Sequence, residues 1–156
     1  MPQTQEVRDL VARMKPLPIR ELIQGTRLLF CEDSIVRGTQ LCDTIQRLFD
    51  FGAKEVHMRP ACPPLIYGCR FLNFSRSKSE LELAGRRSIS ELVGHQEEVA
   101  LEEYSDHRTE KYCAMVERTR HRLNLTTLQY QTLPYMVEAL DMPKERVCTY
   151  CWDGRG

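Results

Sequence analysis

The feature that most constrains the fold of this chain is a pair of short apolar runs. A loop and an amphipathic stretch lie between them. The first run covers residues 27–31 and ends at two acidic residues, which is typical of a strand buried on both faces. From Thr39 onward apolar residues recur with helical period, and Gly52 stands where a helix end favours glycine. Residues 55–59 alternate before Pro60 and predict a second strand. This order predicts a βαβ unit with parallel strands.

The second half of the chain has a helical pattern instead. Helices are predicted over residues 79–93, from Asp106 to Asn124, and from Thr132 to Leu140. The acidic stretch between the first two is expected to be a solvated connector. We therefore predict an α/β fold in two parts, with a parallel-sheet core in residues 1–75 and a helical region in residues 76–156 that ends in a Cys-x-x-Cys motif.

Composition excludes several classes of protein. The 156 residues include 22 basic and 22 acidic side chains and are 42% hydrophobic, as expected for one ordinary globular domain. A net charge of zero gives no broad attraction to nucleic acid or to an anionic membrane. The sequence has no apolar run long enough to span a membrane and no signal peptide, so we expect a cytoplasmic protein without a nucleic-acid or membrane partner.

The loop between the first strand and its helix carries the clearest chemistry. Parallel sheets bind ligands at the carboxyl ends of their strands, and a helix N-terminus offers unpaired amides to an anion. Gly38 allows close approach of the backbone, while Ser34 and Thr39 add hydroxyl groups. Glu32 and Asp33 suit sugar hydroxyls or Mg²⁺, so the loop fits a ribose 5-phosphate. The alternative is a solvated turn in which Thr39 only caps the helix.

At these residues the sequence resembles a known family. The run 28–39 is similar to the phosphoribosyl pyrophosphate signature of type I phosphoribosyltransferases. Its residues resemble the form of this signature found in the glutamine amidophosphoribosyltransferase family. Further similar segments follow in the same order: Gly52 to His57, Pro63-Pro64, Cys69, and Cys148 to Cys151. The resemblance covers nearly the whole chain. It implies a partial type I phosphoribosyltransferase with a Rossmann-like parallel sheet, followed by the helical region.

The resemblance also implies an activity, the transfer of glutamine-derived ammonia to phosphoribosyl pyrophosphate to give 5-phosphoribosylamine in purine biosynthesis. Glu32 and Asp33 would contact the ribose hydroxyls and Mg²⁺, and Asp33 would stabilise positive charge as pyrophosphate leaves. Arg37 would order the loop or face pyrophosphate. The residues expected to bind phosphoribosyl pyrophosphate are Glu32, Asp33, Ser34, Ile35, Val36, Arg37, Gly38 and Thr39.

The chain has seven cysteines, and their odd number leaves at least one unpaired. Cys31, Cys42 and Cys113 lie in apolar or periodic segments and are predicted to be core residues. From spacing alone, the remaining thiols fit a zinc site, a [4Fe–4S] cluster or reduced thiols. By the resemblance, Cys69, Cys148 and Cys151 match three ligands of a [4Fe–4S] cluster, and Cys62 is not one of them. The histidines His57, His95, His107 and His121 are interpreted as structural or solvated.

The family's glutaminase part begins with a nucleophilic cysteine, whereas this chain begins with Met1-Pro2. We therefore expect a C-terminal portion of the enzyme that is inactive alone and works with an N-terminal glutaminase and transferase part or as a homo-oligomer. Because a parallel pair of strands needs cover on both faces, the chain is also expected to expose apolar surface. The alternatives are a non-catalytic module that binds phosphoribosyl pyrophosphate or a nucleotide, and a metal-stabilised interaction domain.

Overall fold

The structure is a computed structural model that describes residues 19–69, 71, 80–94 and 99–155. The first half holds α2 (Arg20–Ile23), β1 (Arg27–Glu32), α3 (Thr39–Asp50) and β2 (Glu55–Pro60). The second half holds η1 (Glu80–Glu82), α4 (Ala84–Val93), α5 (Glu102–Ser105), α6 (Glu110–Arg122), β3 (Thr127–Leu128), α7 (Leu133–Ala139), η2 (Lys144–Arg146) and α8 (Tyr150–Asp153). Within these described residues no helix has the length and apolar character needed to cross a membrane.

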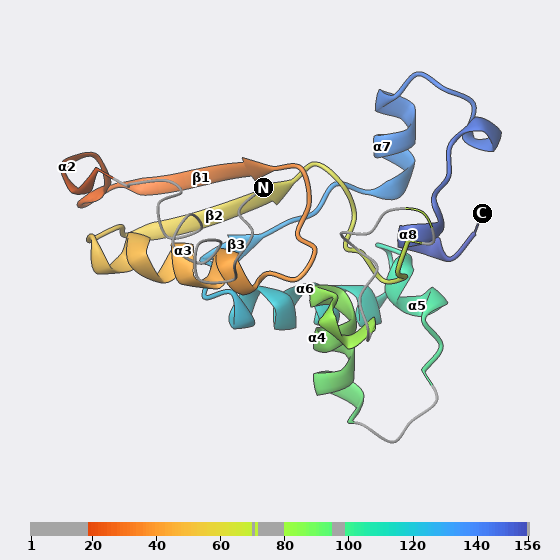
Figure 1. The fold of residues 1–156 in the computed structure, drawn as a ribbon, viewed down its shortest axis with the longest axis horizontal. Helices are drawn as coiled ribbons and strands as arrows, with labels where there is room; N and C mark the ends of the chain where they lie inside the picture. The colour runs from red at the N-terminus through yellow and green to blue at the C-terminus, as the bar shows by residue number, and fades with distance from the viewer. Residues whose placement is uncertain (1–18, 70, 72–79, 95–98, 156) are drawn as a thin grey trace, which may run out of the picture.

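The strands form one parallel sheet in the order β1-β2-β3 (Figure 1). Leu28 pairs with Val56 across the first ladder, and Met58 pairs with Leu128 across the second. The predicted βαβ unit is therefore confirmed, and with it the α/β fold class. Helix α3 ends at Asp50, and Gly52 takes a φ of 89°, which explains the glycine there. Strand β3 was not predicted because two residues carry no visible alternation.

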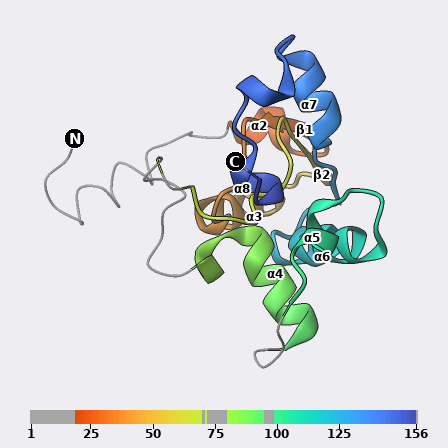
Figure 2. The same ribbon diagram turned by 90° about the vertical axis from the view of Figure 1, so that its right-hand side faces the viewer.

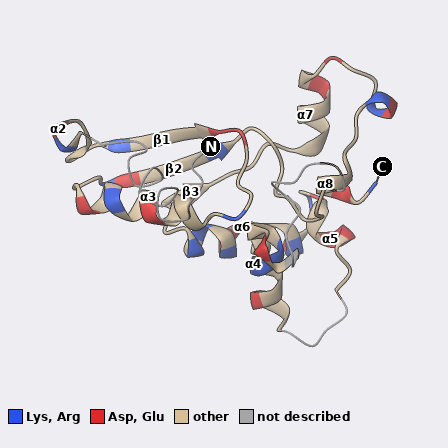
Figure 3. Ribbon diagram, in the orientation of Figure 1, with Lys and Arg blue, Asp and Glu red and all other residues tan. Residues whose placement is uncertain are grey.

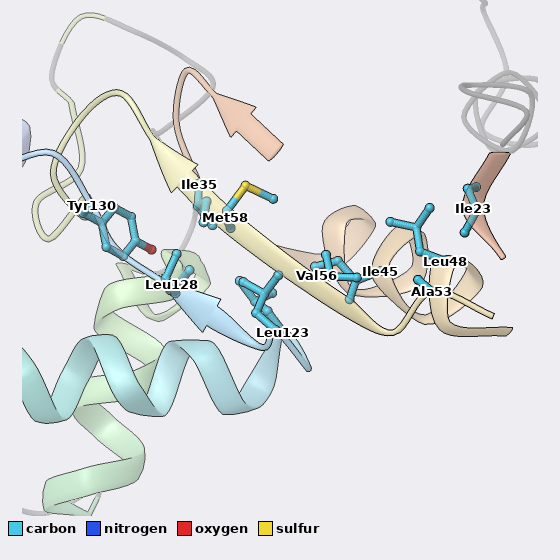
Figure 4. Packing of buried hydrophobic residues seen from close by; sticks show 12 residues of the cluster. Ile23, Ile35, Ile45, Leu48, Ala53, Val56, Met58, Leu123, Leu128 and Tyr130 are labelled. Atoms are coloured by element: carbon cyan, nitrogen blue, oxygen red, sulfur yellow. The ribbon is translucent and has the colours of Figure 1, made fainter. Parts of the chain in front are cut away.

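The main core lies on one face of the sheet (Figure 4). Val56 and Met58 point into it from β2 and are almost completely buried, and they meet Ile45 and Leu48 of α3. Residues from the second half complete this core, namely Ala84, Leu123, Leu125, Leu128 and Tyr130. The sheet thus draws buried side chains from both halves of the sequence.

A second core lies among α4, α5 and α6, which Figure 2 shows together away from the sheet. Its buried members are Ile66, Ile89, Tyr104, Tyr112 and Met115. The buried hydroxyl groups of Ser88 and Thr119 are 2.8 Å apart and hydrogen-bond α4 to α6. A buried hydrogen bond of this kind fixes the relative position of two helices, because neither hydroxyl can turn to water instead.

The prediction that the first strand is buried on both faces is wrong. Leu29 is 64% exposed, and Cys31, which was predicted to be a core residue, is exposed as well. The reason is that β1 is an edge strand, and alternation turns Leu29 and Cys31 away from the core. Among the described residues, Leu29 and Cys31 therefore form the exposed apolar part of the outward face of β1.

The helical predictions in the second half need three corrections. The helix expected from Asp106 begins after Thr109, whose Oγ1 accepts a hydrogen bond from the Tyr112 amide at 3.1 Å. The acidic connector contains the short helix α5, which buries Tyr104. Cys113 was predicted to be a core residue but is exposed, because it lies on the solvent side of α6, whereas Cys42 packs against the core as predicted.

In two further predicted helices, apolar side chains that were expected to be buried are not. The segment expected to be one helix over residues 79–93, of which residue 79 lies outside the described residues, is divided into η1 and α4. Leu81 and Leu92 are 45% and 44% exposed. Helix α7 begins after Thr132 with Pro134 in its first turn, as predicted, but the Thr132 side chain makes no capping hydrogen bond. None of its residues is buried, and Tyr135 is 63% exposed.

Replacing Leu48 with alanine tests the main core. Leu48 is 5% exposed, so Leu48→Ala leaves a cavity and is expected to lower the free energy of unfolding by about 2–5 kcal/mol. Leu29→Ala is the matched control, since Leu29 is 64% exposed, and is expected to change it by about 0.5 kcal/mol or less. Urea unfolding measures both, and equal losses would contradict the assignment of the core face.

Candidate functional site

Residues 32–39, here called the β1–α3 loop, lie at the carboxyl end of β1 and run into α3 (Figure 1). The Ala61 amide donates a hydrogen bond to the Glu32 carbonyl oxygen at 2.8 Å, so the chain that follows β2 lies beside the start of this loop. Figure 3 shows acidic residues where β1 ends. The loop therefore occupies the edge of the sheet where parallel α/β proteins bind ligands.

The carboxylates of Glu32 and Asp33 are both exposed. Glu32 Oε1 accepts a hydrogen bond from the Asp33 amide at 3.1 Å, and Asp33 Oδ1 accepts one from the Ser34 amide at 2.5 Å. The Ser34 hydroxyl also lies 3.3 Å from Asp33 Oδ1. These local bonds fix the direction of the two side chains but use only one oxygen of each. With respect to the described residues, the second oxygen of each carboxylate is thus left for hydroxyl groups or a hard cation.

Two contacts hold the middle of the β1–α3 loop against the rest of the structure. Ile35 is 4% exposed and packs into the main core close to Met58 (Figure 4). The carbonyl oxygen of Val36 accepts a hydrogen bond from the Ala84 amide at 2.8 Å, which joins the loop to the start of α4. A buried apolar side chain and a backbone hydrogen bond therefore set the course of the loop independently of any ligand.

Gly38 makes the turn into α3. Its φ is 76°, and a Cβ at this position would lie 3.0 Å from Leu123 Cδ2. Gly38 is also the N-cap of α3, no side chain caps the helix, and the first turn contains no acidic residue. Thr39 is therefore not the cap that the alternative interpretation required. The first amides of a twelve-residue helix stay open to an anion.

Arg37 is the one basic side chain of the loop, and it forms an ion pair with Glu82 of η1. The distance from Arg37 Nη2 to Glu82 Oε2 is 3.2 Å. Sequence analysis did not single out Glu82, because nothing in its local pattern indicates a contact with a loop so far away along the chain. Of the two roles expected for Arg37, this geometry matches the ordering of the loop.

Cys62, Tyr130 and Trp152 lie near the carboxyl edge of the sheet. Burial raises the pKa of the Cys62 thiol, the nearby Trp152 indole lowers that pKa, and the charge of Asp33 raises it. Burial also raises the pKa of Tyr130. Among the described residues, neither the Tyr130 hydroxyl nor the Trp152 indole nitrogen has a hydrogen-bond partner of normal geometry. One sequence signal points to this cluster, since Trp152 is the single tryptophan and follows the Cys-x-x-Cys motif directly.

The thiols of Cys69, Cys148 and Cys151, here called the thiol cluster, come together from distant segments. The amides of Ile66 and Tyr67 donate hydrogen bonds to the Cys151 carbonyl oxygen at 2.9 and 3.0 Å, which places α8 beside the chain after β2. Burial raises the pKa of the Cys151 thiol to about 12, and a hydrogen bond with Cys69 and the charges of Cys69 and Cys148 add to the increase.

These thiols match the donor chemistry of the sulfur-rich sites expected from the sequence. Across the described ranges, however, no three His, Cys, Asp or Glu side chains converge closely enough to hold a single metal ion. The histidines have other partners. The ring nitrogens of His57 lie 2.9 Å from Glu55 Oε2 and from Thr127 Oγ1. His107 and His121 face neighbouring carboxylates, and His95 lies outside the described residues.

A separate hollow of about 560 Å³ lies between the connection from α5 to α6 and the C-terminal residues. Its walls carry both acidic and basic side chains, including Glu102, Asp106, Arg108, Lys144 and Asp153. Arg108 Nη2 lies 2.7 Å from Asp106 Oδ2, and this guanidinium holds the pKa of Asp106 well below its usual range. Ligand pockets are mostly apolar with a few polar groups, so this charged hollow does not compete with the loop as a candidate site.

The substitution Gly38→Ala tests the turn into α3. Alanine here would have to adopt a left-handed backbone conformation, which costs about 1–2 kcal/mol, and its Cβ would also press against Leu123. The free energy of unfolding is therefore expected to fall by more than the backbone strain alone. Gly25→Ala is the matched control, because Gly25 has a φ of 75° with nothing within 4 Å of the added Cβ. Urea unfolding of the two variants separates contact from strain. A loss in Gly38→Ala no greater than in Gly25→Ala would show that the contact with Leu123 has no effect.

No family model matches the chain. Curated relatives do. The amidophosphoribosyltransferase of Mycobacterium tuberculosis (strain H37Rv) is 34% identical over 152 residues, which are 97% of this chain and 24% of the relative. That of Methanothermobacter thermautotrophicus is 30% identical over 151 residues, which are 97% of this chain and 26% of the relative. The chloroplastic enzyme of Vigna aconitifolia is 38% identical over 89 residues, which are 57% of this chain and 18% of the relative.

Solved structures show the same fold. The glutamine phosphoribosylpyrophosphate amidotransferase of Bacillus subtilis, in complex with ADP and GMP, matches with a TM-score of 0.65 at 22% identity, covering 99% of this chain and 29% of that one. A structure described as the allosteric regulatory enzyme of purine biosynthesis matches with a TM-score of 0.64 at 22% identity, covering 99% and 28%.

The chain spans about a quarter of the length of the curated relatives from Mycobacterium and Methanothermobacter. The family resemblance recognised in residues 28–39 is confirmed by these matches, which extend over nearly the whole chain. Over the segment that it matches, the chain is a homologue of the amidophosphoribosyltransferases.

Proposed function

We propose that this chain is the C-terminal, phosphoribosyl-binding portion of an amidophosphoribosyltransferase and that the β1–α3 loop binds phosphoribosyl pyrophosphate. One observation carries the proposal. The loop joins an exposed acidic pair, Glu32 and Asp33, to an open helix N-terminus at the carboxyl edge of a parallel sheet. Each end of this arrangement suits a different part of a ribose 5-phosphate.

The 5′-phosphate would lie at the start of α3. The amides of the first helical turn point along the helix axis toward it, and the helix dipole adds a partial positive charge there. The left-handed conformation of Gly38 lets the backbone approach closely, and the hydroxyl groups of Ser34 and Thr39 complete the set of donors. Ile35 and Val36 take part through their backbone, because the Ile35 side chain is buried in the core.

The ribose would lie over Glu32 and Asp33. The free oxygen of each carboxylate accepts a hydrogen bond from a ribose hydroxyl or binds Mg²⁺, which proteins usually hold through one or two carboxylates together with substrate phosphates. Bound Mg²⁺ would neutralise charge on the pyrophosphate leaving group. The two exposed oxygens fit this use, since the remaining ligands would come from the substrate and water.

In the reaction, the bond from ribose C1 to pyrophosphate breaks and ammonia takes its place, giving 5-phosphoribosylamine for purine biosynthesis. The Asp33 carboxylate would stabilise the positive charge that develops on the sugar, because a fixed negative group acts strongly where charge appears in the transition state. Ammonia released from glutamine would come from a part of the enzyme outside the matched quarter, supplied by an N-terminal part or a second subunit.

As a second element of the proposal, the thiol cluster would hold a sulfur-bound metal group with a structural role, and binding would have to draw its three thiols closer together than they lie in the described residues. Cys69, Cys148 and Cys151 would provide three ligands of a [4Fe–4S] cluster, or of Zn²⁺ as the alternative. The observation that favours this is the hydrogen bond between Cys69 and Cys151, with Cys148 nearby. A group bound here would tie α8 to the chain that follows β2.

The double substitution Glu32→Ala/Asp33→Ala tests the proposed ribose site. Titration calorimetry of the purified chain with phosphoribosyl pyrophosphate is expected to show binding that depends on Mg²⁺, and the double variant is expected to lose at least about tenfold in affinity, because it removes both carboxylate ligands. The control Asp43→Ala/Asp50→Ala removes the same charge from the exposed side of α3 and is expected to bind normally. Unchanged affinity in the first variant, in a chain shown by circular dichroism to be folded, would contradict the proposal.

The thiol cluster predicts a distinctive pH dependence of alkylation. In chain freed of metal by a chelator, the pKa of Cys151 is raised to about 12, mainly by burial, so the reactive thiolate forms only at high pH. The iodoacetamide rate at Cys151, followed by mass spectrometry, is expected to keep rising above pH 10. A plateau by about pH 10, where an ordinary thiol is almost fully ionised, would show that Cys151 is not partly buried beside Cys69 and Cys148.

A further inference from the structure

Two contacts join the β1–α3 loop to the segment 82–84, which lies much later in the chain. The Ala84 amide donates a hydrogen bond to the Val36 carbonyl oxygen at 2.8 Å, and Arg37 Nη2 lies 3.2 Å from Glu82 Oε2. Two adjacent residues of the loop are thus held by two positions of the later segment, 84 through the backbone and 82 through charge. Two such contacts fix the orientation of the loop as well as its distance from α4.

The later segment is itself firmly placed. Leu83 is completely buried, and Ala84 is 2% exposed. A Cβ on Gly85 would lie 2.9 Å from the Leu65 carbonyl oxygen, so α4 approaches that backbone as closely as its glycine allows. The Ser88–Thr119 hydrogen bond and the ion pairs from Glu91 to Arg118 and Arg122, at 2.6 and 3.2 Å, tie α4 to α6. The segment 82–84 therefore forms a rigid platform for the loop.

The side of the loop that meets a ligand has no such support. Glu32, Asp33 and Thr39 are exposed, and within the described residues the side-chain hydrogen bonds of Glu32 and Asp33 are to immediate neighbours. The side chains of Arg37 and Glu82 are 49% and 38% exposed, so their ion pair adds little to the stability of the whole chain. Its effect is local, because it holds the residue directly before the Gly38 turn.

We propose that Glu82 is a positioning residue for the β1–α3 loop and acts through Arg37. The guanidinium is held against η1 by Glu82 and orders the loop through this contact, without touching the phosphate. This inference rests on the proposed function for its biochemical meaning, since the ordered loop is the one that would receive the 5′-phosphate. The structural part of the inference is independent of any ligand.

Hydrogen exchange of the Ala84 amide, measured by NMR in the ligand-free chain, tests the structural part. This amide exchanges when the loop lifts from the platform, because its acceptor is Val36. Arg37→Gln and Glu82→Gln are each expected to speed its exchange about two- to fivefold, the range of one exposed ion pair, and the double variant is expected to match the single ones. The Arg87 amide, bonded to Leu83 within α4, is an internal reference that stays unchanged.

The control Glu103→Gln removes another exposed ion pair, in which Lys111 Nζ lies 2.8 Å from Glu103 Oε2, and is expected to leave Ala84 exchange unchanged. The inference is overturned if Glu82→Gln does not alter Ala84 exchange, or if the effects of the two single variants multiply in the double variant. Independent effects would mean that the two residues act on the loop separately.

Titration with ribose 5-phosphate tests the biochemical part. If Arg37 acts only through Glu82, the two single variants lose affinity by the same factor and Glu82→Asp recovers part of it. A loss in Arg37→Gln that persists in the Glu82→Gln background would place the guanidinium on the phosphate and overturn the inference. Failure of the unsubstituted chain to bind ribose 5-phosphate would count against the proposed function, whereas Ala84 exchange would still decide whether Glu82 positions the loop.

Discussion

The parallel pairing of β1 with β2 is the constraint on which the rest of the structure depends. Parallel neighbours need a crossover connection, and here α3 provides it and covers one face of the sheet. The same pairing places the ends of both strands at one edge. The residues that follow them, Asp33 after β1 and Cys62 after β2, are consequently close enough for the charge of Asp33 to raise the Cys62 pKa. The parallel direction of the two strands thus brings the residues of the candidate site together at one edge of the sheet.

Local patterns made the βαβ unit and its loop predictable. Helical periodicity, a glycine at the helix end and the acidic pair all lie within one short stretch, and each keeps its expected position in the structure. The thiol cluster was predicted differently, by resemblance, since spacing alone left zinc, iron–sulfur and free thiols open. Cys69 and Cys151 come together through backbone hydrogen bonds from Ile66 and Tyr67 that no sequence pattern encodes.

The failures share a physical origin, because each depends on which neighbour a segment finds. Cys31 has the apolar surroundings of a core residue, but β1 is an edge strand and its outward face is open. Strand β3 is too short to show alternation and exists because the edge of β2 offers partners to residues such as Leu128. Glu82 is an ordinary acidic residue until the fold brings it to Arg37. Periodicity reports which side of an element is apolar, and it cannot report what covers that side.

The charges around the β1–α3 loop also limit how it can attract an anion. The chain has no net charge, Glu82 neutralises Arg37, and two carboxylates precede the helix, so the long-range field offers little attraction. What remains is the short-range field of the backbone amides at the start of α3, where the first turn contains no acid. Such a field acts only on a group that fits against the backbone. Selection of a phosphate by the proposed site would therefore depend on shape and on the left-handed turn at Gly38 more than on charge.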